Sequence, residues 1–232
     1  MWSSFVGLFF GLVLGARHAL EPDHLTAVTV LAAESRSARR TALLGALWGL
    51  GHTAALLGAG TILVCFSAAM PPSLGDAFEL LVAVMLVGLG LSALRRATRS
   101  GAEGPAEPHA HGAEHHVHPG APGHIHLGSR VLAARPLFVG LIHGLAGSGA
   151  LVALVVARLP SIAERMSFIG LFGLGSMLGM TLLSGMLGLP LAALSRAPLT
   201  ARLLGGLSGV VSIALGVAWG SPIWARLAGA AG

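Results

Sequence analysis

The sequence predicts an all-α integral membrane protein, and three observations lead to this fold class. Hydrophobic residues make up 54% of the 232 residues and charged residues only 10%, with a mean hydropathy of +0.81, which lies outside the range of soluble domains. The apolar residues form six stretches long enough to cross a bilayer, which takes about 17 to 25 residues. No ten-residue alternating pattern suggests a barrel, so the backbone must satisfy its hydrogen bonds within helices.

The six expected helices divide the chain into two membrane units joined by a loop. They cover roughly residues 2–20, 43–66, 77–94, 136–158, 166–194 and 203–220. The first has neither a basic segment before its apolar stretch nor a small-residue cleavage site after it, so we interpret it as a retained helix rather than a signal peptide. The expected organisation is a three-helix unit at 1–98, a histidine-rich flexible cytoplasmic loop at 99–134 and a second three-helix unit at 135–232.

The basic residues indicate the orientation in the membrane. All 14 are arginine, so a Walker A motif, which needs lysine, is absent. Ten of them follow the first, third and fifth predicted spans, and the positive-inside rule therefore places these loops in the cytoplasm and both termini outside. Arg158 and Arg165 oppose this orientation, whereas Trp2, Trp219 and Trp224 would fall at the external interface and support it. We expect a multi-pass protein of the cell's inner (plasma) membrane whose net charge of +5 reflects topology and not nucleic-acid binding.

Two pairs of short segments recur within the chain. Residues 5–12 resemble residues 138–145, and residues 47–52 resemble residues 171–176. Because each unit contains three crossings, the second unit must enter the membrane in the opposite orientation, which is the plan of many secondary transporters. The sequence therefore predicts two inverted three-helix repeats. The alternative is chance similarity between helices rich in glycine and leucine.

Glycines at helical spacing accompany each of three histidines inside the predicted spans. The stripes are Gly7, Gly11 and Gly15 before His18; Gly45 and Gly49 before His52; and Gly140, Gly144 and Gly147 around His143. Small residues spaced this way mark the faces on which membrane helices approach closely. We therefore expect all three histidines to point into the helix bundle.

A proline follows closely on the first of these histidines. Pro22 cannot donate a hydrogen bond to the carbonyl of His18, and its fixed φ suits the first position of a new helix. We expect the first span to break near Pro22 and a second half-helix to run to about Ser35. On an unbroken helix Asp23 and His24 would lie about 140° and 240° around the axis from His18. The break would allow the three side chains to converge.

These side chains are candidate metal ligands, because ionisable groups at membrane depth are costly and commonly functional. Our predicted ligand set is His18, Asp23, His24 and His52, with Glu21 as a base beside it or a fifth ligand. Imidazole and carboxylate without thiolate suit nickel, cobalt, zinc, iron or copper(II). The alternative is a polar core in which these groups only bond to one another.

Three more residues are predicted to act as secondary metal ligands or a gate: His143, Ser176 and Met180. His143 stands alone in its span, so an interior histidine with satisfied hydrogen bonds is an equally reasonable reading. Ser176 and Met180 share a helix face and could line a path beyond the main site. Methionine at helical spacing more commonly fills a core.

The loop between the two units contains seven histidines among prolines and glycines: His109, His111, His115, His116, His118, His124 and His126. With few apolar residues it cannot pack a core. These imidazoles could collect or buffer cytoplasmic metal, or dock a cytoplasmic metallochaperone. A spacer of biased composition is the alternative.

The motifs resemble a known family. Residues 17–24, RHALEPDH, are similar to the histidine/aspartate signature of the nickel/cobalt transporter superfamily, and residues 49–53, GLGHT, resemble its second signature. Residues 141–149, LIHGLAGSG, look like the branch of shorter, six-helix members called urease accessory transmembrane proteins. The resemblance implies a metal-recognition role for the four predicted ligands.

The predicted function is a secondary transporter, or permease, for a divalent transition-metal ion, foremost nickel or cobalt, with the bilayer and the ion as partners and no other cofactor. We favour import, because the membrane potential contributes about 2.3 kcal/mol per charge per 100 mV. Three alternatives remain: efflux coupled to protons, a membrane metalloenzyme, and a non-transporting accessory subunit for metalloenzyme maturation. A His-Glu-x-x-His box is absent, so we expect no enzyme.

Overall fold

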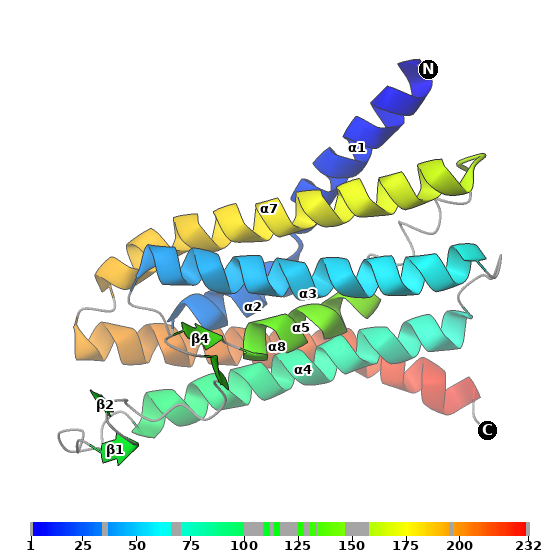
Figure 1. The fold of residues 1–232 in the computed structure, drawn as a ribbon. Coiled ribbons are helices and arrows are strands. Elements are labelled where there is room, and N and C mark those ends of the chain that lie inside the picture. Colours follow the sequence, from blue (N-terminus) through cyan, green and yellow to red (C-terminus); the bar gives the residue numbers. More distant parts are fainter. Residues whose placement is uncertain are drawn as a thin grey trace.

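Seven helices are seen in the part of the chain that the computed structural model describes, which comprises residues 2–33, 37–65, 71–99, 109–111, 114–116, 125–127, 130–132, 134–146, 158–194 and 197–230. The helices are α1 (Trp2–His18), α2 (Pro22–Ala33), α3 (Ala38–Cys65), α4 (Pro72–Arg99), α5 (Ala134–Leu145), α7 (Ile162–Leu194) and α8 (Pro198–Ala230). Their order and arrangement are shown in Figure 1.

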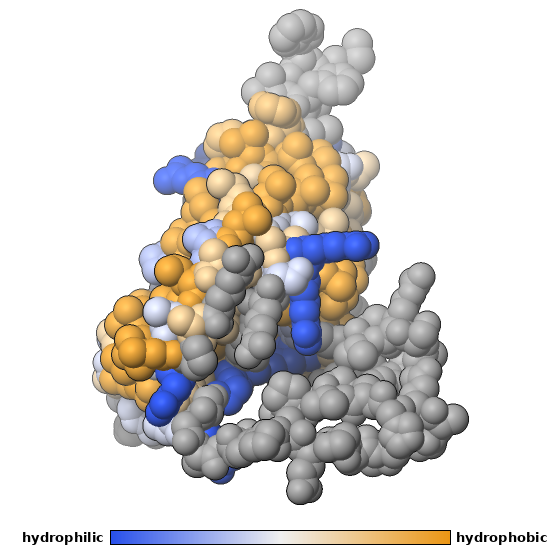
Figure 2. Space-filling model, turned by 90° about the vertical axis from the view of Figure 1, so that its left-hand side faces the viewer, coloured by the Kyte–Doolittle hydropathy of each residue, from blue (hydrophilic) through white to orange (hydrophobic). Residues whose placement is uncertain are grey.

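Four of these helices, α3, α4, α7 and α8, are long and apolar enough to cross a membrane. Their outer faces present large hydrophobic side chains such as Ile62, Val84, Leu182 and Leu207, each about 60% exposed. Apolar residues accordingly cover much of the described surface in Figure 2. Since such a surface would be unfavourable in water, the helices indicate a membrane protein.

These four helices agree with the predicted spans at 43–66, 77–94, 166–194 and 203–220. The first predicted span, 2–20, corresponds to α1, which is followed by the separate helix α2. Of the fourth predicted span, 136–158, the structure describes α5 as far as Leu145, and residues 147–157 lie outside the described residues. In the described residues, four of the six predicted spans are therefore long helices, and the first and fourth correspond to the shorter helices α1 and α5.

The long helices pack in two pairs, and the short helices lie against them. α3 packs along α7, and α4 packs along α8. In Figure 1 the members of each pair run in opposite directions along the bundle. α1 lies on α7, whereas α5 lies on α3, so each short helix contacts a long helix from the other half of the chain. α2 contacts α4, α7 and α8 near the centre of the bundle.

Two glycines allow the short helices to approach the long helices closely. A Cβ atom at Gly15 of α1 would overlap the carbonyl oxygen of Phe172 in α7, and one at Gly140 of α5 would overlap the carbonyl oxygen of Trp48 in α3. The long helices contribute glycines to the same contacts. A Cβ at Gly175 would overlap the backbone of Leu12 in α1.

The contact between α3 and α5 has the matching glycine. A Cβ at Gly51 would overlap the carbonyl oxygen of Leu137. The predicted close approach of the glycine faces is therefore confirmed in three helices. The glycines concerned are Gly11 and Gly15 in α1, Gly45 and Gly49 in α3, and Gly140 and Gly144 in α5. Backbones at this separation gain many van der Waals contacts, which are the main source of helix association in lipid.

Between α4 and α5 the structure describes two small antiparallel hairpins that the sequence did not predict. Strands β1 (His109–His111) and β2 (Glu114–His116) pair with His109 opposite His116. Strands β3 (Ile125–Leu127) and β4 (Arg130–Leu132) pair with His126 opposite Val131. α4 ends at Arg99 and α5 begins at Ala134, so this whole segment joins the two halves.

Candidate metal centre

A break between α1 and α2 brings the first histidine to the centre of the bundle. α1 ends at His18, whose carbonyl oxygen accepts a hydrogen bond from the backbone N–H of Glu21 at 3.0 Å. Pro22 begins α2 and Asp23 lies in its first turn. The predicted break near Pro22 is therefore confirmed, because proline has no N–H with which to continue the first helix. The half-helix that follows ends at Ala33.

The break brings three histidines together. His18 at the end of α1, His24 in α2 and His52 in α3 offer one ring nitrogen each, and these donor atoms lie within 4.8 Å of one another. The ring of His24 is 4.5 Å from that of His18 and 5.5 Å from that of His52, measured between centroids. All three side chains are buried. Three predicted ligands from three helices therefore share one site.

A second group of donors adjoins the first and shares His24 with it. Donor atoms of Asp23, His24 and His143 also lie within 4.8 Å of one another. Asp23 reaches both histidines: Oδ1 is 3.1 Å from Nδ1 of His24, and Oδ2 is 3.3 Å from Nε2 of His143. The four predicted ligands therefore do not form one set: His18, His24 and His52 form the first group, and Asp23 belongs to the second. The structure places the carboxylate between His24 and His143.

Most of the ring nitrogens in this cluster have no hydrogen-bond partner in the described chain. His52 lacks a partner at both ring nitrogens, His143 lacks one at Nδ1, and His18 and His24 lack one at Nε2. An unsatisfied polar group in a buried position costs about 1 to 3 kcal/mol. The alternative of a self-satisfied polar core therefore fits poorly. Neutral imidazoles with free lone pairs are the chemistry that binds a borderline divalent cation.

Acidic neighbours orient two of the rings. Glu21 Oε1 is 2.8 Å from Nδ1 of His18, and Asp23 holds Nδ1 of His24. Carboxylates bound to one nitrogen of a histidine fix its tautomer and leave the other nitrogen as a ligand. The Glu21 side chain is 47% exposed, so it contacts the cluster from its edge. This geometry fits the predicted base beside the ligands better than a fifth ligand.

Two aromatic rings that the sequence analysis did not select border the cluster. The indole of Trp48 stacks on His24 at 5.2 Å and meets His143 edge-on at 5.4 Å. Phe172 of α7 lies 5.4 Å from His18. A sequence signal was available for Trp48, because it precedes His52 by four residues and so shares its helix face. These rings exclude water from the histidines.

The chain is similar in sequence to a known protein over most of its length. The chain is 33% identical over 189 residues to the Urease accessory protein UreH of Bacillus sp. (strain TB-90), an alignment that covers 82% of this chain and 79% of the relative. This chain belongs to the UreH family of urease accessory proteins. The family-level resemblance seen in the motifs is thereby supported. No protein-family model matches the chain, and no solved structure matches it.

Two of the predicted secondary residues of this UreH-family protein lie beside the cluster with other partners. The hydroxyl of Ser176 is buried and donates to the carbonyl oxygen of Gly15, at 3.1 Å. Met180 is fully buried in the hydrophobic core, where Ala19, Val28 and Trp48 also lie. Both side chains therefore hold α7 against its neighbours. Met180 fits the core-filling reading that the sequence left open.

The loop histidines of the UreH-family chain are separate from the central cluster in sequence. Five of them lie within strands: His109, His111, His115, His116 and His126. His118 and His124 lie outside the described residues. Of these residues the structure gives the strand register alone. A metal-collecting role therefore stays a prediction.

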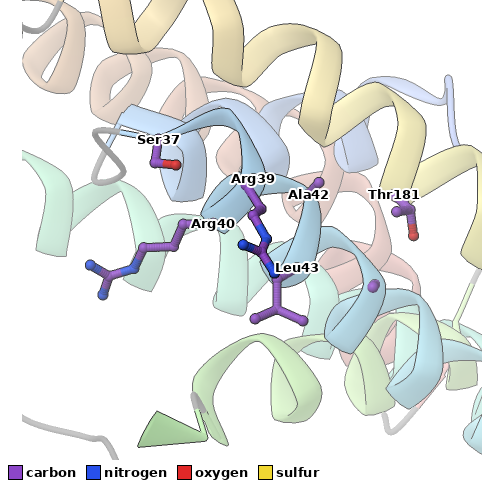
Figure 3. Close-up of a pocket in the computed structure, with 7 residues that line it drawn as sticks. Ser37, Arg39, Arg40, Ala42, Leu43 and Thr181 are labelled. Carbon is purple, nitrogen blue, oxygen red and sulfur yellow. The ribbon is translucent and has the colours of Figure 1, made fainter. Parts of the chain in front are cut away.

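A hollow at the start of α3 is a poor place for a cation. It is lined by Ser37, Arg39, Arg40, Ala42, Leu43, Ala46 and Thr181. Figure 3 shows the side chains of Arg39 and Arg40 extending from α3 at this position. Two guanidinium groups repel a dication at short range. The histidine cluster is thus the candidate centre of this UreH-family protein.

Proposed function

We propose that this UreH-family protein is a secondary transporter for a divalent transition-metal ion, foremost nickel or cobalt. The observation that carries the proposal is the buried histidine cluster with unpartnered ring nitrogens at a helix break. His52 lies midway along α3, about 20 Å from either end at the rise of a helix. Ion sites at interrupted helices near the middle of the membrane are characteristic of secondary transporters.

The charges around the cluster suit one dication. Asp23 is buried among the histidines, and Glu21 contacts His18 from the edge. Two carboxylates compensate two positive charges, so the ion can shed its water without leaving a large net charge in the membrane. An inward-negative potential of 100 mV contributes about 4.6 kcal/mol to the entry of a dication. This contribution favours import over efflux.

The helix contacts support two inverted repeats. Gly15 contacts Phe172 and Gly140 contacts Trp48, and each of these pairs joins a short helix to a long helix of the other half. The contact of α1 with α7 matches the contact of α5 with α3 when residues 12–19 are aligned with residues 137–144. This register differs by eight residues from the match between 5–12 and 138–145. The match between 47–52 and 171–176 keeps its register, because Trp48 and Phe172 take corresponding places in these contacts.

The choice of nickel rests on the family. The relative is named a urease accessory protein, and this name favours a nickel-related function. Cobalt(II) prefers similar nitrogen and oxygen ligands, so the donor set fits both ions. We therefore place nickel first and cobalt second, in a multi-pass protein of the plasma membrane.

Replacement of His52 tests transport directly. We expect His52→Ala to abolish the uptake of Ni²⁺ and Co²⁺ by proteoliposomes with an inside-negative potential, because it removes a central donor. Ser212→Ala is the matched control: Ser212 is equally buried in α8 and donates to the carbonyl oxygen of Leu86. It should transport as the wild type does. Wild-type protein that moves no ion in this assay would contradict the proposal.

A non-transporting accessory subunit is the second candidate, because the relative's name says accessory protein. Such a subunit would dock a metallochaperone through the histidine-rich segment between α4 and α5. Deletion of residues 101–132 discriminates the two functions. A transporter should still move ions in liposomes without this segment and should depend on His52. An accessory subunit should depend on the segment and tolerate His52→Ala.

A further inference from the structure

The group of donors that contains Asp23 has the features of a binding site in its own right. It consists of Asp23, His24 and His143. His143 is 2% exposed, and its Nδ1 has no partner in the described chain. Its Nε2 is 3.3 Å from Oδ2 of Asp23, and its ring centroid is 4.7 Å from that of His24. Two nitrogens and one oxygen therefore converge beside the three-histidine group.

His24 lies between the two groups and belongs to both. Its Nδ1 faces Asp23, whereas its Nε2 is free and buried. The two nitrogens of an imidazole point in different directions. The Nδ1 edge of His24 can therefore face Asp23 and His143, and the Nε2 edge can face His18 and His52. His24 can therefore bind the ion in either position, through a different ring nitrogen in each, with its ring proton on the nitrogen that is not bound to the ion.

The charges allow only one ion at a time. Asp23 and Glu21 balance a single dication, and a second dication a few ångströms away would be uncompensated in a buried, low-dielectric site. The two groups are therefore alternative positions for one ion. They differ in chemistry, because the first has nitrogen donors and the second adds a carboxylate oxygen.

The helix contacts place His18 and His143 at corresponding positions in the two halves of the chain. His18 comes three residues after Gly15, which packs on Phe172; His143 comes three residues after Gly140, which packs on Trp48. His143 thus occupies in the second half the place that His18 occupies in the first. In an inverted repeat the two halves exchange roles when the transporter opens to the other side.

We propose that Asp23, His24 and His143 form a second site for the transported ion, and that the ion passes between this site and the site of His18, His24 and His52. His24 is a ligand in both sites, through a different ring nitrogen in each. The proposal rests on the transport function, since it describes the step within the membrane. It makes His143 a metal ligand, whereas the sequence left open whether this histidine is a ligand or a structural residue of the interior.

Co²⁺ binding and uptake by the full chain test the proposal, with visible absorption as a ligand-sensitive signal. Wild type should bind one Co²⁺ per chain. His18→Ala and His143→Ala should each still bind one Co²⁺, with an affinity within about 100-fold of wild type and with different spectra. The double variant should lose binding. The wild-type spectrum should be a weighted sum of those of the two single variants.

Uptake by proteoliposomes completes the test. Each single variant should bind Co²⁺ but lose at least about 10-fold in the initial rate of uptake, because transfer needs both sites. His143→Asn, which keeps a polar side chain and a similar size, should show the same loss if His143→Ala proves unstable. Ser212→Ala should match the wild type in both assays.

Three results would overturn the second site. These are loss of Co²⁺ binding in His18→Ala, an unchanged uptake rate in His143→Ala and His143→Asn, and two Co²⁺ ions bound at once in the wild type. Failure of the transport function is a different result. In that case wild-type protein would bind one Co²⁺ in the same pattern of variants and move none across the membrane.

Discussion

Single glycines decide how near the histidines of different helices can come. Gly140 packs against the backbone of Trp48 and His52 in α3, and His143 follows it by less than one turn of α5. A side chain at this position has no space, because the neighbouring atoms are backbone. The separation of α5 from α3, and with it the position of His143 relative to His24, therefore depends on the missing Cβ.

We expect Gly140→Ala to destabilise the protein by about 1 to 3 kcal/mol, since inserting a methyl group into a packed interface forces the helices apart. The measurement is thermal unfolding in detergent, followed by Co²⁺ binding to the folded fraction. Gly88→Ala is the control. A Cβ at Gly88 of α4 meets nothing within 4 Å, so this change should be neutral or stabilising by up to about 1 kcal/mol. Equal stability of the two variants would disprove the close-packing argument.

At the scale of the element, the break between α1 and α2 gives the cluster its geometry. Leu25 N–H donates to the carbonyl oxygen of Glu21 at 2.9 Å, so the second helix starts its own hydrogen bonds immediately after the break. His18 can then lie beside His24, with ring centroids 4.5 Å apart. A continuous helix would place these rings on different faces.

Pro22→Ala restores the missing N–H and should favour a continuous helix through this region. We expect the affinity for Co²⁺ or Ni²⁺ to fall by at least about tenfold, which is 1.4 kcal/mol, while the protein stays folded. Isothermal titration of the purified protein measures this change.

Pro72→Ala is the matched control for this element. Pro72 also begins a helix, α4, but the residue before it, Pro71, is not helical and also lacks an N–H, so this substitution does not extend a helix through the position. Metal affinity should stay at the wild-type value. A Pro22→Ala variant with unchanged affinity would show that packing alone holds the break.

At the scale of the whole molecule, arginines mark one end of the bundle. Arg135 at the start of α5 donates to Ser92 of α4, and Arg202 at the start of α8 donates to the carbonyl oxygen of Ala97. Arg40 lies at the start of α3, at the same end in Figure 1. The ends of four helices therefore gather the basic residues that the positive-inside rule assigns to the cytoplasm.

Cysteine labelling in cells checks this orientation. In a Cys65→Ser background, we expect Leu74→Cys, at the opposite end, to react with a membrane-impermeant maleimide added outside. Arg40→Cys should react only after the membrane is made permeable. Both positions are exposed in the structure, so reactivity reports the side of the membrane. The reverse pattern would place both termini in the cytoplasm.

The local features of the chain could be predicted from the sequence, because they depend on residues close to one another. Hydropathy predicted the long helices α3, α4, α7 and α8, and a single proline predicted the break after His18. Ionisable residues in apolar segments marked His24 and His52 as candidate ligands. Each of these inferences needs only the preference of a residue for lipid or for a backbone conformation.

The tertiary structure decided which of these residues meet. It joined His143 to Asp23 and gave Ser176 and Met180 partners in the packing of α7. The hairpins between α4 and α5 were likewise not evident from composition. Sequence alone determined that buried histidines and a broken helix belong to this membrane protein. Their grouping into two overlapping donor sets depends on how α5 and α1 lie on helices of the opposite half, and such contacts are set by packing between residues far apart in the chain.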